Sequence, residues 1–333
     1  MKKQDVMVFI TALVMMISCA ALSFGQTMLK EYNLSEYTSK YGNILPIGVN
    51  NEGKAFGPAV QEGNLQIVKY LVETYPWLNL LNAPMKNKKG EKTLPICIAA
   101  ANGDTNLVNY MLEQRPNLVN PRCYPGKSKP FFIYQNDDER TPLWEAIENI
   151  HPDTALALLS HNASAKQTGS RKYTGSDSSR MLWYDIDFDR TVPLIKVAEV
   201  IKDKKTLQEL IPALLRAGAS PKTLRGVGSF SSDAFFFAAM NKNIDFINIL
   251  RDEIIKQGET PKSQYYKWEC HESFLASWSD GKTTYEERIQ KIRDERKKEV
   301  ESINNSKEVS LLKNNGIQFE LVINNLSEEE FCY

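Results

Sequence analysis

The feature that most limits the fold is a pair of short helices separated by a tight break. It is first seen in "AVQEGNLQIVKYLVE", residues 59–73, where helical spacing stops at Gly63 and restarts at once. Glycine supplies the positive φ that a bulkier residue resists. The pattern therefore predicts two antiparallel helices, with Ile67, Val68 and Leu71 of the second buried against the first.

The same pattern recurs four more times. Each copy has small residues in its first helix, then a break, then a second helix rich in Leu, Ile and Val. The copies are "LPICIAAANGDTNLVNYML" from Leu94, "TPLWEAIENIHPDTALALLSHNAS" from Thr141, "TVPLIKVAEVIKDKKTLQELIPALLRAGAS" from Thr191 and "DAFFFAAMNKNIDFINILRDEI" from Asp233. Because neither helix of a pair can bury its apolar face alone, the pattern predicts a stack of repeats.

From Asn51 to Gln257 the chain resembles the ankyrin-repeat family. Thr141-Pro142-Leu143 matches the family's helix start, and the family's usual His after Leu is absent. Further matches are the prolines Pro95 and Pro193 and the terminal step Gly218-Ala219, whereas the positions of the missing His hold Gly57, Cys97 and Trp144. The resemblance implies an all-α ankyrin-repeat solenoid that binds a protein partner through its loops and concave helix face.

The repeat spacing is longer than the family's. Intervals between the central alanines are 40, 47, 52 and 40 residues, against about 33 for a regular unit; these alanines are Ala59, Ala99, Ala146, Ala198 and Ala238. The surplus predicts loop insertions at Arg122–Arg140 and Gln167–Arg190, which we interpret as β-hairpin-like fingers. Their aromatic residues and one neighbour are the partner-binding candidates: Tyr124, Phe131, Phe132, Tyr134, Trp144, Trp183 and Tyr184. The alternative is that these aromatics fold back over the core.

The N-terminus is typical of a secretory signal peptide covering residues 1–25. A basic start is followed by an apolar run from Val6 to Leu22, and Ser23-Phe24-Gly25 supplies the small residues that a signal peptidase needs before Gln26. We therefore expect a secreted or periplasmic protein with no membrane insertion after cleavage. An uncleaved anchor helix and lipidation of Cys19 remain alternatives.

Three further segments follow the signal peptide: an N-terminal cap segment at 26–50, about five repeats at 51–260, and a helical C-terminal cap region at 261–333. In the last, Tyr285–Ile303 has helical spacing, with six acidic and six basic residues in 286–301. We interpret it as a solvated helix lying on the last repeat, and the alternative is a partner-binding helix. Gly316 then predicts a helix end before an alternating run.

No motif in the sequence predicts a catalytic, cofactor or metal site. The 41 basic and 41 acidic residues give no reason to expect nucleic acid as a partner. Asp185, Asp187 and Asp189 resemble the start of a calcium loop, but Arg190 stands where that loop needs glycine. Cys270-His271-Glu272 places thiol, imidazole and carboxylate at adjacent positions that diverge in regular structure.

Four cysteines follow the signal peptide, namely Cys97, Cys123, Cys270 and Cys332. We expect no disulfide framework on which the fold depends, and we expect Cys97 to act as a small apolar residue. Whether any of the four pair is left open.

The function that fits these patterns is a non-enzymatic protein-binding module in the cell envelope. Two alternatives stay open. One is an enzyme whose site lies in the C-terminal region, and the other is an immunity or inhibitor protein that occludes another protein of the envelope.

Overall fold

The computed structural model describes residues 52–124, 140–166, 169–171, 189–227, 230–270, 275–276 and 282–326. The chain forms two compact units, Met1–Ala99 and Ala100–Tyr333. Across these described residues, no helix combines the length and apolar character that crossing a bilayer requires.

Helix pairs follow one another as the repeating pattern predicts. The five pairs between Glu52 and Lys256 are α3 (Glu52–Gln61) with α4 (Leu65–Thr74), α5 (Pro95–Asn102) with α6 (Thr105–Gln114), α7 (Pro142–Glu148) with α8 (Pro152–Ser160), α9 (Pro193–Val200) with α10 (Lys204–Arg216), and α11 (Ala234–Met240) with α12 (Ile244–Lys256). Single turns of 3-10 helix lie between pairs: η1 (Pro76–Leu78), η2 (Leu80–Asn82) and η3 (Pro116–Val119). The expected helical repeats are confirmed.

In the first unit, α3 packs against α4 and their facing side chains form a small core. Phe56 and Ala59 of α3 are almost fully buried, as are the expected Ile67, Val68 and Leu71 of α4. Gly63 lies between the two helices with φ of 71°, the left-handed value that the break requires.

The central alanines have a second role beyond their small size. The backbone carbonyls of Ala59 and Ala146 each accept an N–H from five residues later, at 2.8 Å, and Ala238 does the same. This bond closes the helix end when the residue before the donor adopts a left-handed conformation. The left-handed position is Gly63 in the first pair but Ile150 and Lys242 in two later pairs, with φ of 61° and 53°.

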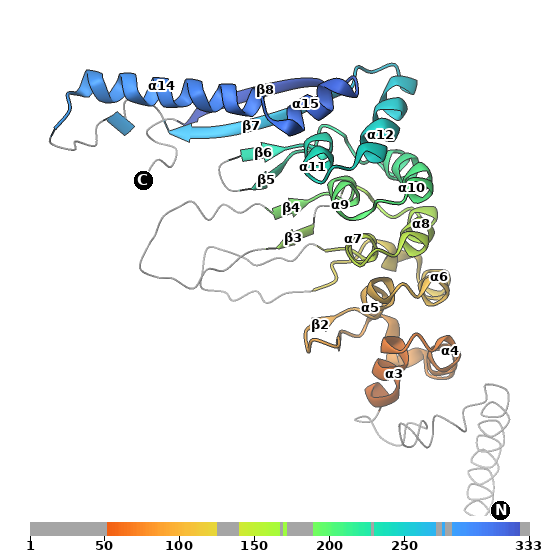
Figure 1. Ribbon diagram of the computed structural model, residues 1–333. Helices are drawn as coiled ribbons and strands as arrows, with labels where there is room; N and C mark the ends of the chain where they lie inside the picture. Colours follow the sequence, from red (N-terminus) through yellow and green to blue (C-terminus); the bar gives the residue numbers. More distant parts are fainter. Residues whose placement is uncertain are drawn as a thin grey trace, which may run out of the picture. The chain divides into compact units, whose positions relative to one another are not determined.

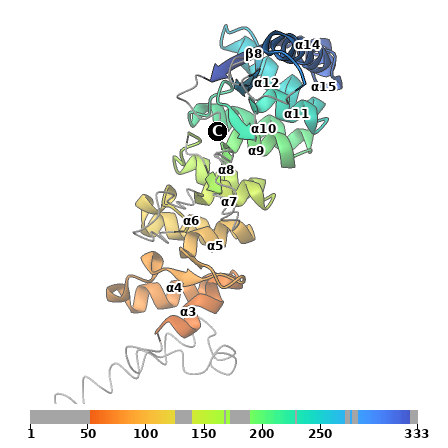
Figure 2. The same ribbon diagram turned by 90° about the vertical axis from the view of Figure 1, so that its left-hand side faces the viewer.

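In the second unit the helices form two rows. Within the first row α7, α9 and α11 pack on one another, and within the second row α6, α8, α10 and α12 do so. Figures 1 and 2 show these rows side by side, with β3 to β8 on the far side of the first row. The largest fully buried side chains of this unit include Leu143, Phe235 and Phe246.

Strands occupy the loops between pairs. β1 (Met85–Lys86) pairs with β2 (Lys92–Thr93), and β3 (Gly169–Arg171) with β4 (Asp189–Thr191), both antiparallel. β5 (Arg225–Val227) and β6 (Phe230–Ser232) form a third antiparallel hairpin. The insertion predicted at Gln167–Arg190 has paired strands at both of its ends, and the residues between 171 and 189 lie outside the described residues.

The C-terminal region differs from the helical cap predicted from sequence. β7 (Lys262–Cys270) extends the β5–β6 hairpin and pairs in parallel with β8 (Gln318–Leu326), giving a four-stranded sheet in the order β5-β6-β7-β8. The connection between β7 and β8 contains α14 (Tyr285–Asn304) and α15 (Lys307–Asn314). The prediction of a helical cap with an alternating run after Gly316 did not include β7, because the pairing of β7 with β8 joins segments far apart in sequence.

The helix predicted at Tyr285 is present but does not lie on the last repeat as expected. α14 packs alongside α15, its Glu299 forms an ion pair with Lys267 of β7, and Arg288 Nε donates to the carbonyl of Ala276 at 2.7 Å. It is α15 that contacts α11. Gly316 ends α15 with φ of 76°, as predicted.

Two cysteines correct a further expectation. Cys97 and Cys123 are both buried and both disulfide-bonded, so Cys97 is not simply a small apolar residue. A free cysteine and a disulfide-bonded cysteine occupy the same kind of buried position on a helix. Helical spacing therefore could not predict the disulfide.

Candidate interaction surface

The first insertion is closed at its base by three contacts to Arg140. The N–H of Cys123 donates to the Arg140 carbonyl at 2.7 Å, so the two ends of the insertion are bonded through the backbone. The Arg140 guanidinium lies 4.0 Å from the centre of the Tyr124 ring and 3.3 Å from Glu145. Because the guanidinium is held by both a ring and a carboxylate, the point at which the insertion leaves the repeats is fixed.

Charged and aromatic side chains continue along the first helices from this point. The Lys196 ammonium lies 5.5 Å from the Trp144 ring and forms ion pairs with Glu148 and Glu199, the latter at 3.7 Å. Arg225 of β5 also pairs with Glu199, and its guanidinium lies 5.0 Å from the ring of Phe237.

These side chains are largely withdrawn from solvent, with exposed fractions of 16% for Lys196 and 19% for Glu199. An ion pair that is partly buried is screened less by salt than an exposed one. The network therefore links α7, α9 and α11 to β5 through partly buried charges.

The second insertion is closed by the backbone of two strands. Gly169, Ser170 and Arg171 of β3 pair with Thr191, Arg190 and Asp189 of β4. The segment between them thus starts and finishes at one hairpin, whose strand β4 contacts β5 of the following repeat.

The structure describes two of the seven predicted partner-binding residues. Tyr124 is half-buried beneath Arg140, and Trp144 is 5% exposed within the network above. Trp144 therefore leaves little side chain for a partner to contact. The other five, Phe131, Phe132, Tyr134, Trp183 and Tyr184, lie outside the described residues.

The positions considered for catalysis or cations lie apart from one another or outside the described residues. Cys270 ends β7 and Asp189 begins β4, whereas His271, Glu272, Asp185 and Asp187 fall in ranges that the structure does not describe. Within the described part of the chain, no group of three or more His, Cys, Asp or Glu side chains is placed to hold a metal ion.

The closure of the first insertion could not be found from sequence spacing, because it joins residues near the start of the insertion to Arg140 at its end. The signal available was the pair Tyr124 and Arg140 at its two ends, an aromatic ring and a cation that can stack. The same holds for Lys196 and Trp144, which lie in different repeats.

Comparison with known proteins agrees with the repeat geometry. The sequence model described as ankyrin repeats in three copies matches residues 56–168, which contain α4 to α8 and most of α3. No curated protein matches the chain. Ankyrin repeats are generally protein-protein interaction modules, and the family is typically not enzymatic. The helix pairs α3 to α8 and this match together identify ankyrin repeats at residues 56–168.

Proposed function

We propose that this chain is an exported, non-enzymatic binding module that captures a protein partner with its two aromatic insertions. The observation that carries the proposal is the fixed base of each insertion. Arg140 closes the first and the β3–β4 hairpin closes the second. A binding loop that leaves a rigid base loses less conformational entropy on capture than one that leaves a mobile one.

The composition of the insertions supports recognition of a protein surface. They carry Phe131, Phe132 and Tyr134 in the first and Trp183 and Tyr184 in the second. Aromatic residues contribute a large share of binding energy in protein interfaces, and each dominant one typically contributes about 2 kcal/mol or more. Charged side chains alone would give a weaker and more salt-sensitive contact.

Export is supported by the leader and by cysteine chemistry. The chain begins with the basic, apolar and small-residue parts of a signal peptide. Cys97 and Cys123 are disulfide-bonded, and disulfides persist mainly in oxidising compartments such as the periplasm or the extracellular space.

The binding role is tested with the double variant Phe132→Ala with Trp183→Ala. The variant should capture much less partner from an extract of the native cell envelope, while its helical circular dichroism and melting temperature stay at wild-type values. Trp77→Ala is the matched control, because Trp77 is an aromatic residue that is 73% exposed and far in sequence from both insertions. Unchanged capture by the folded double variant would contradict the proposal, and unfolding would assign the aromatics to the core.

Export is tested separately on protein isolated from its native cells. Mass spectrometry should find Gln26 as the first residue, and an intact Met1 or a lipid on Cys19 would contradict it. Cys97 and Cys123 should resist alkylation until the protein is reduced and unfolded.

A further inference from the structure

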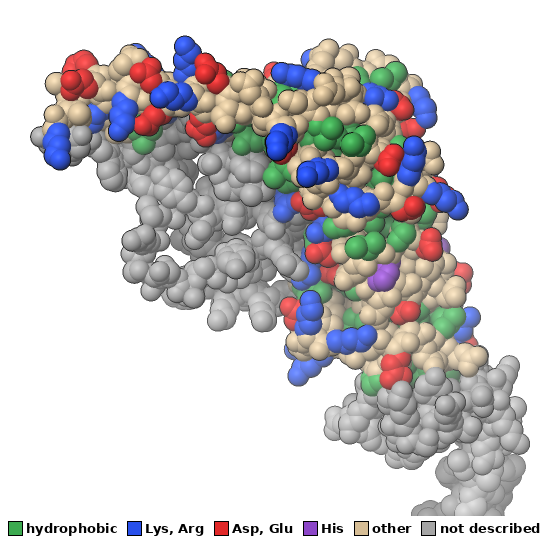
Figure 3. Space-filling model, viewed as in Figure 1, with side chains coloured by type: hydrophobic (Ala, Val, Ile, Leu, Met, Phe, Trp, Pro, Cys, Tyr) green, Lys and Arg blue, Asp and Glu red, His purple; other side chains and the backbone are tan. Residues whose placement is uncertain are grey.

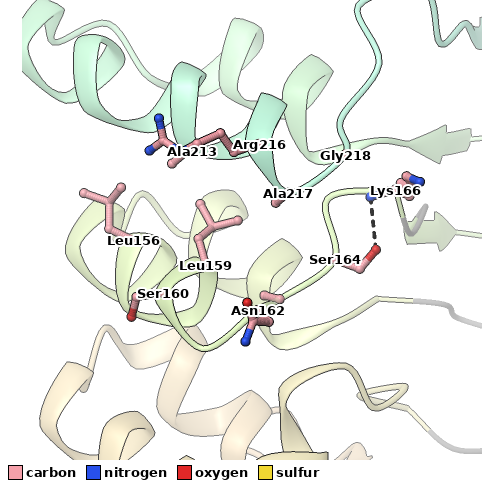
Figure 4. Close-up of a pocket in the computed structure, with 11 residues that line it drawn as sticks. Leu156, Leu159, Ser160, Asn162, Ser164, Lys166, Ala213, Arg216, Ala217 and Gly218 are labelled. Carbon is pink, nitrogen blue, oxygen red and sulfur yellow. Dashed lines mark hydrogen bonds between the residues drawn. The ribbon is translucent and has the colours of Figure 1, made fainter.

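A groove lies between the second helices α8 and α10, on the side of the helix rows away from the strands. Its volume is about 700 Å³, and its lining comes from the two helices and from the loops that follow them. Figure 4 shows Leu156 and Leu159 pointing from α8 toward α10, where Ala213 and Ala217 leave room. Both leucines are half-buried, so the groove has an apolar floor that water still reaches.

The charge of the groove has one sign. Lys166 and Arg216 are the charged members of its lining, both are exposed, and the lining contains no acidic residue. Neither cation forms an ion pair among the described residues, in contrast to Lys196 and Arg225 on the other side of the repeats. Two cations that lack an acidic neighbour beside an apolar floor are complementary to a carboxylate that is attached to an apolar group.

The loops that carry these cations are held in place. The N–H of Ala165 donates to the carbonyl of Ala217 at 3.2 Å, which joins the loop after α8 to the end of α10. Asn120 Oδ1 accepts the N–H of Ser164 at 2.8 Å. Gly218 has φ of 90°, and a Cβ at this position would lie 2.5 Å from Cε of Lys166. Because glycine leaves this space free, the lysine stem crosses the loop next to the groove.

We infer that this groove is a second docking surface, one that binds an extended segment of a partner protein carrying Glu or Asp beside Leu-like or aromatic side chains. The part of the groove between α8 and α10 lies across the helix rows from strands β3 and β4 (Figure 1), whereas Lys166 directly precedes the second insertion at Gln167. The apolar side chain fills the space over Leu156 and Leu159, and the carboxylates face Arg216 and Lys166. A volume of this size falls within the range of about 300–1,000 Å³ typical of ligand sites.

The structural alternative for Arg216 is that it only offsets the negative end of the α10 dipole, because it is in the last helical turn. In that role Arg216 would stabilise the helix but would not make the protein bind some peptides more tightly than others. A selection experiment separates the two roles, since it measures preference and not stability.

The test uses immobilised full-length protein and a phage-displayed library of random short peptides. Peptides combining acidic residues with Leu or Phe should be enriched on the wild type. Synthetic copies should bind the double variant Arg216→Glu with Lys166→Glu about tenfold more weakly or worse, a change equivalent to about 1.4 kcal/mol. Lys297→Glu with Lys313→Glu is the matched control, because it reverses two exposed lysines on α14 and α15 and gives the same change in net charge.

Equal enrichment on the wild type and the groove variant, or none on either, would overturn the inference. If the charge-reversed variant misfolds, Arg216→Gln with Lys166→Gln replaces it. Phe132→Ala with Trp183→Ala should retain the enriched peptides, which distinguishes failure of this surface from failure of the insertions. A concentration-dependent dimer of the wild type that the groove variant does not form would assign the groove to a second copy and contradict the partner segment.

Discussion

The helices of the repeats and the long helix of the C-terminal region are stabilised in different ways. α12 has 13 residues and buries Phe246, Ile247, Leu250 and Ile254 against its neighbours. α14 has 20 residues and buries none fully. A short helix in water is marginal unless it packs an apolar face, whereas a longer one gains from its caps and charge pairs. Tertiary contact thus holds the repeat helices, and local interactions contribute a larger share in α14.

Figure 3 shows the same contrast on the surface. Acidic and basic side chains alternate along α14, whereas the repeats expose a mixture of apolar, polar and charged groups. The start of α14 carries a capping box, in which Thr284 Oγ1 accepts the Glu287 N–H at 3.2 Å and Glu287 accepts the Thr284 N–H at 2.7 Å. Such a start is fixed by four consecutive residues and needs no distant partner.

Asp233 links the last repeat to strand β7 of the C-terminal region, and its titration gives the largest expected change in stability. It caps α11 through the Phe236 N–H, and it also accepts the Ser263 hydroxyl at 2.9 Å and the Gln264 N–H at 2.6 Å, both from β7. The residue is 1% exposed, and burial raises the pKa of its carboxyl to about 7, although the donated bonds lower it. The charged form is therefore less favourable in the folded protein than in the unfolded chain.

We expect the free energy of unfolding to fall as pH rises from about 4 to about 7. The folded pKa of Asp233 lies above the unfolded value, so its stabilising contribution is complete below the unfolded pKa and is lost on passing through the folded one. The whole change is up to about 4 kcal/mol. Urea titrations across this range measure it.

Asp233→Asn is the control for this pH dependence. The amide keeps one oxygen for the Phe236 N–H and the Ser263 hydroxyl, which both donate to Oδ1, and it loses the acceptor of the Gln264 N–H but does not titrate in this range. The difference in stability between wild type and variant should change with pH, and a constant difference would contradict the raised pKa.

A substitution at Asn243 breaks the contacts between repeats. Its side-chain amide donates to the carbonyls of Ala198 at 3.0 Å and Ile201 at 2.7 Å in the preceding pair, and its oxygen caps α12 through the Phe246 N–H. Asn243→Ala leaves two carbonyls without these donors and removes a cap, so we expect a loss of about 3 kcal/mol.

Chemical denaturation measures the Asn243→Ala effect, and Asp203→Ala is its matched control. Asp203 caps α10 through the Thr206 N–H but is exposed, so its loss should be clearly smaller. Equal losses for the two variants would show that the bonds of Asn243 to the preceding pair contribute nothing.

Features that depend on neighbouring residues could be predicted from the sequence, whereas contacts between residues far apart in sequence could not. The repeats were predictable because each central alanine and each break recurs locally, and Gly63 and Gly103 have the expected positive φ. β7 was not predicted, because its pairing with β8 depends on residues far apart in sequence. The capping box of Thr284 and Glu287 spans only four residues. Thr284 could therefore have been predicted from local sequence as the N-cap of α14. The contacts of Arg140 and Asn243 required the fold, since each joins different repeats or the two ends of an insertion.

Substitution by glycine at a left-handed break should stabilise the protein, by less than Asn243→Ala destabilises it. Ile150 has φ of 61° although it is β-branched, and its side chain is 57% exposed, so it gains little from burial. Left-handed backbone costs a residue with a Cβ about 1 kcal/mol or more relative to glycine. Ile150→Gly should therefore raise the free energy of unfolding by roughly 0.5–1 kcal/mol, after the larger entropy of the unfolded glycine is subtracted.

Thermal denaturation measures the gain, and Lys242→Gly at the equivalent break is the comparison. Lys242 has φ of 53° but no branch at Cβ, so its gain should be smaller than that of Ile150. A loss of stability in Ile150→Gly would mean that its side chain contributes packing beyond its exposed fraction.

The smallest effect is expected on the exposed face of α14, where single charge pairs contribute little. The Lys291 ammonium lies 4.0 Å from Glu295 one turn later, and the two side chains are 76% and 65% exposed. An exposed pair of this spacing contributes about 0.5 kcal/mol or less and is screened by salt. Lys291→Ala should therefore leave the melting temperature almost unchanged at low salt and unchanged at high salt. In contrast to Asn243→Ala, the variant removes no buried partner. A large loss of stability in Lys291→Ala would mean that α14 is held by contacts of its charged face with another segment, and the contrast between α14 and the repeat helices would then be wrong.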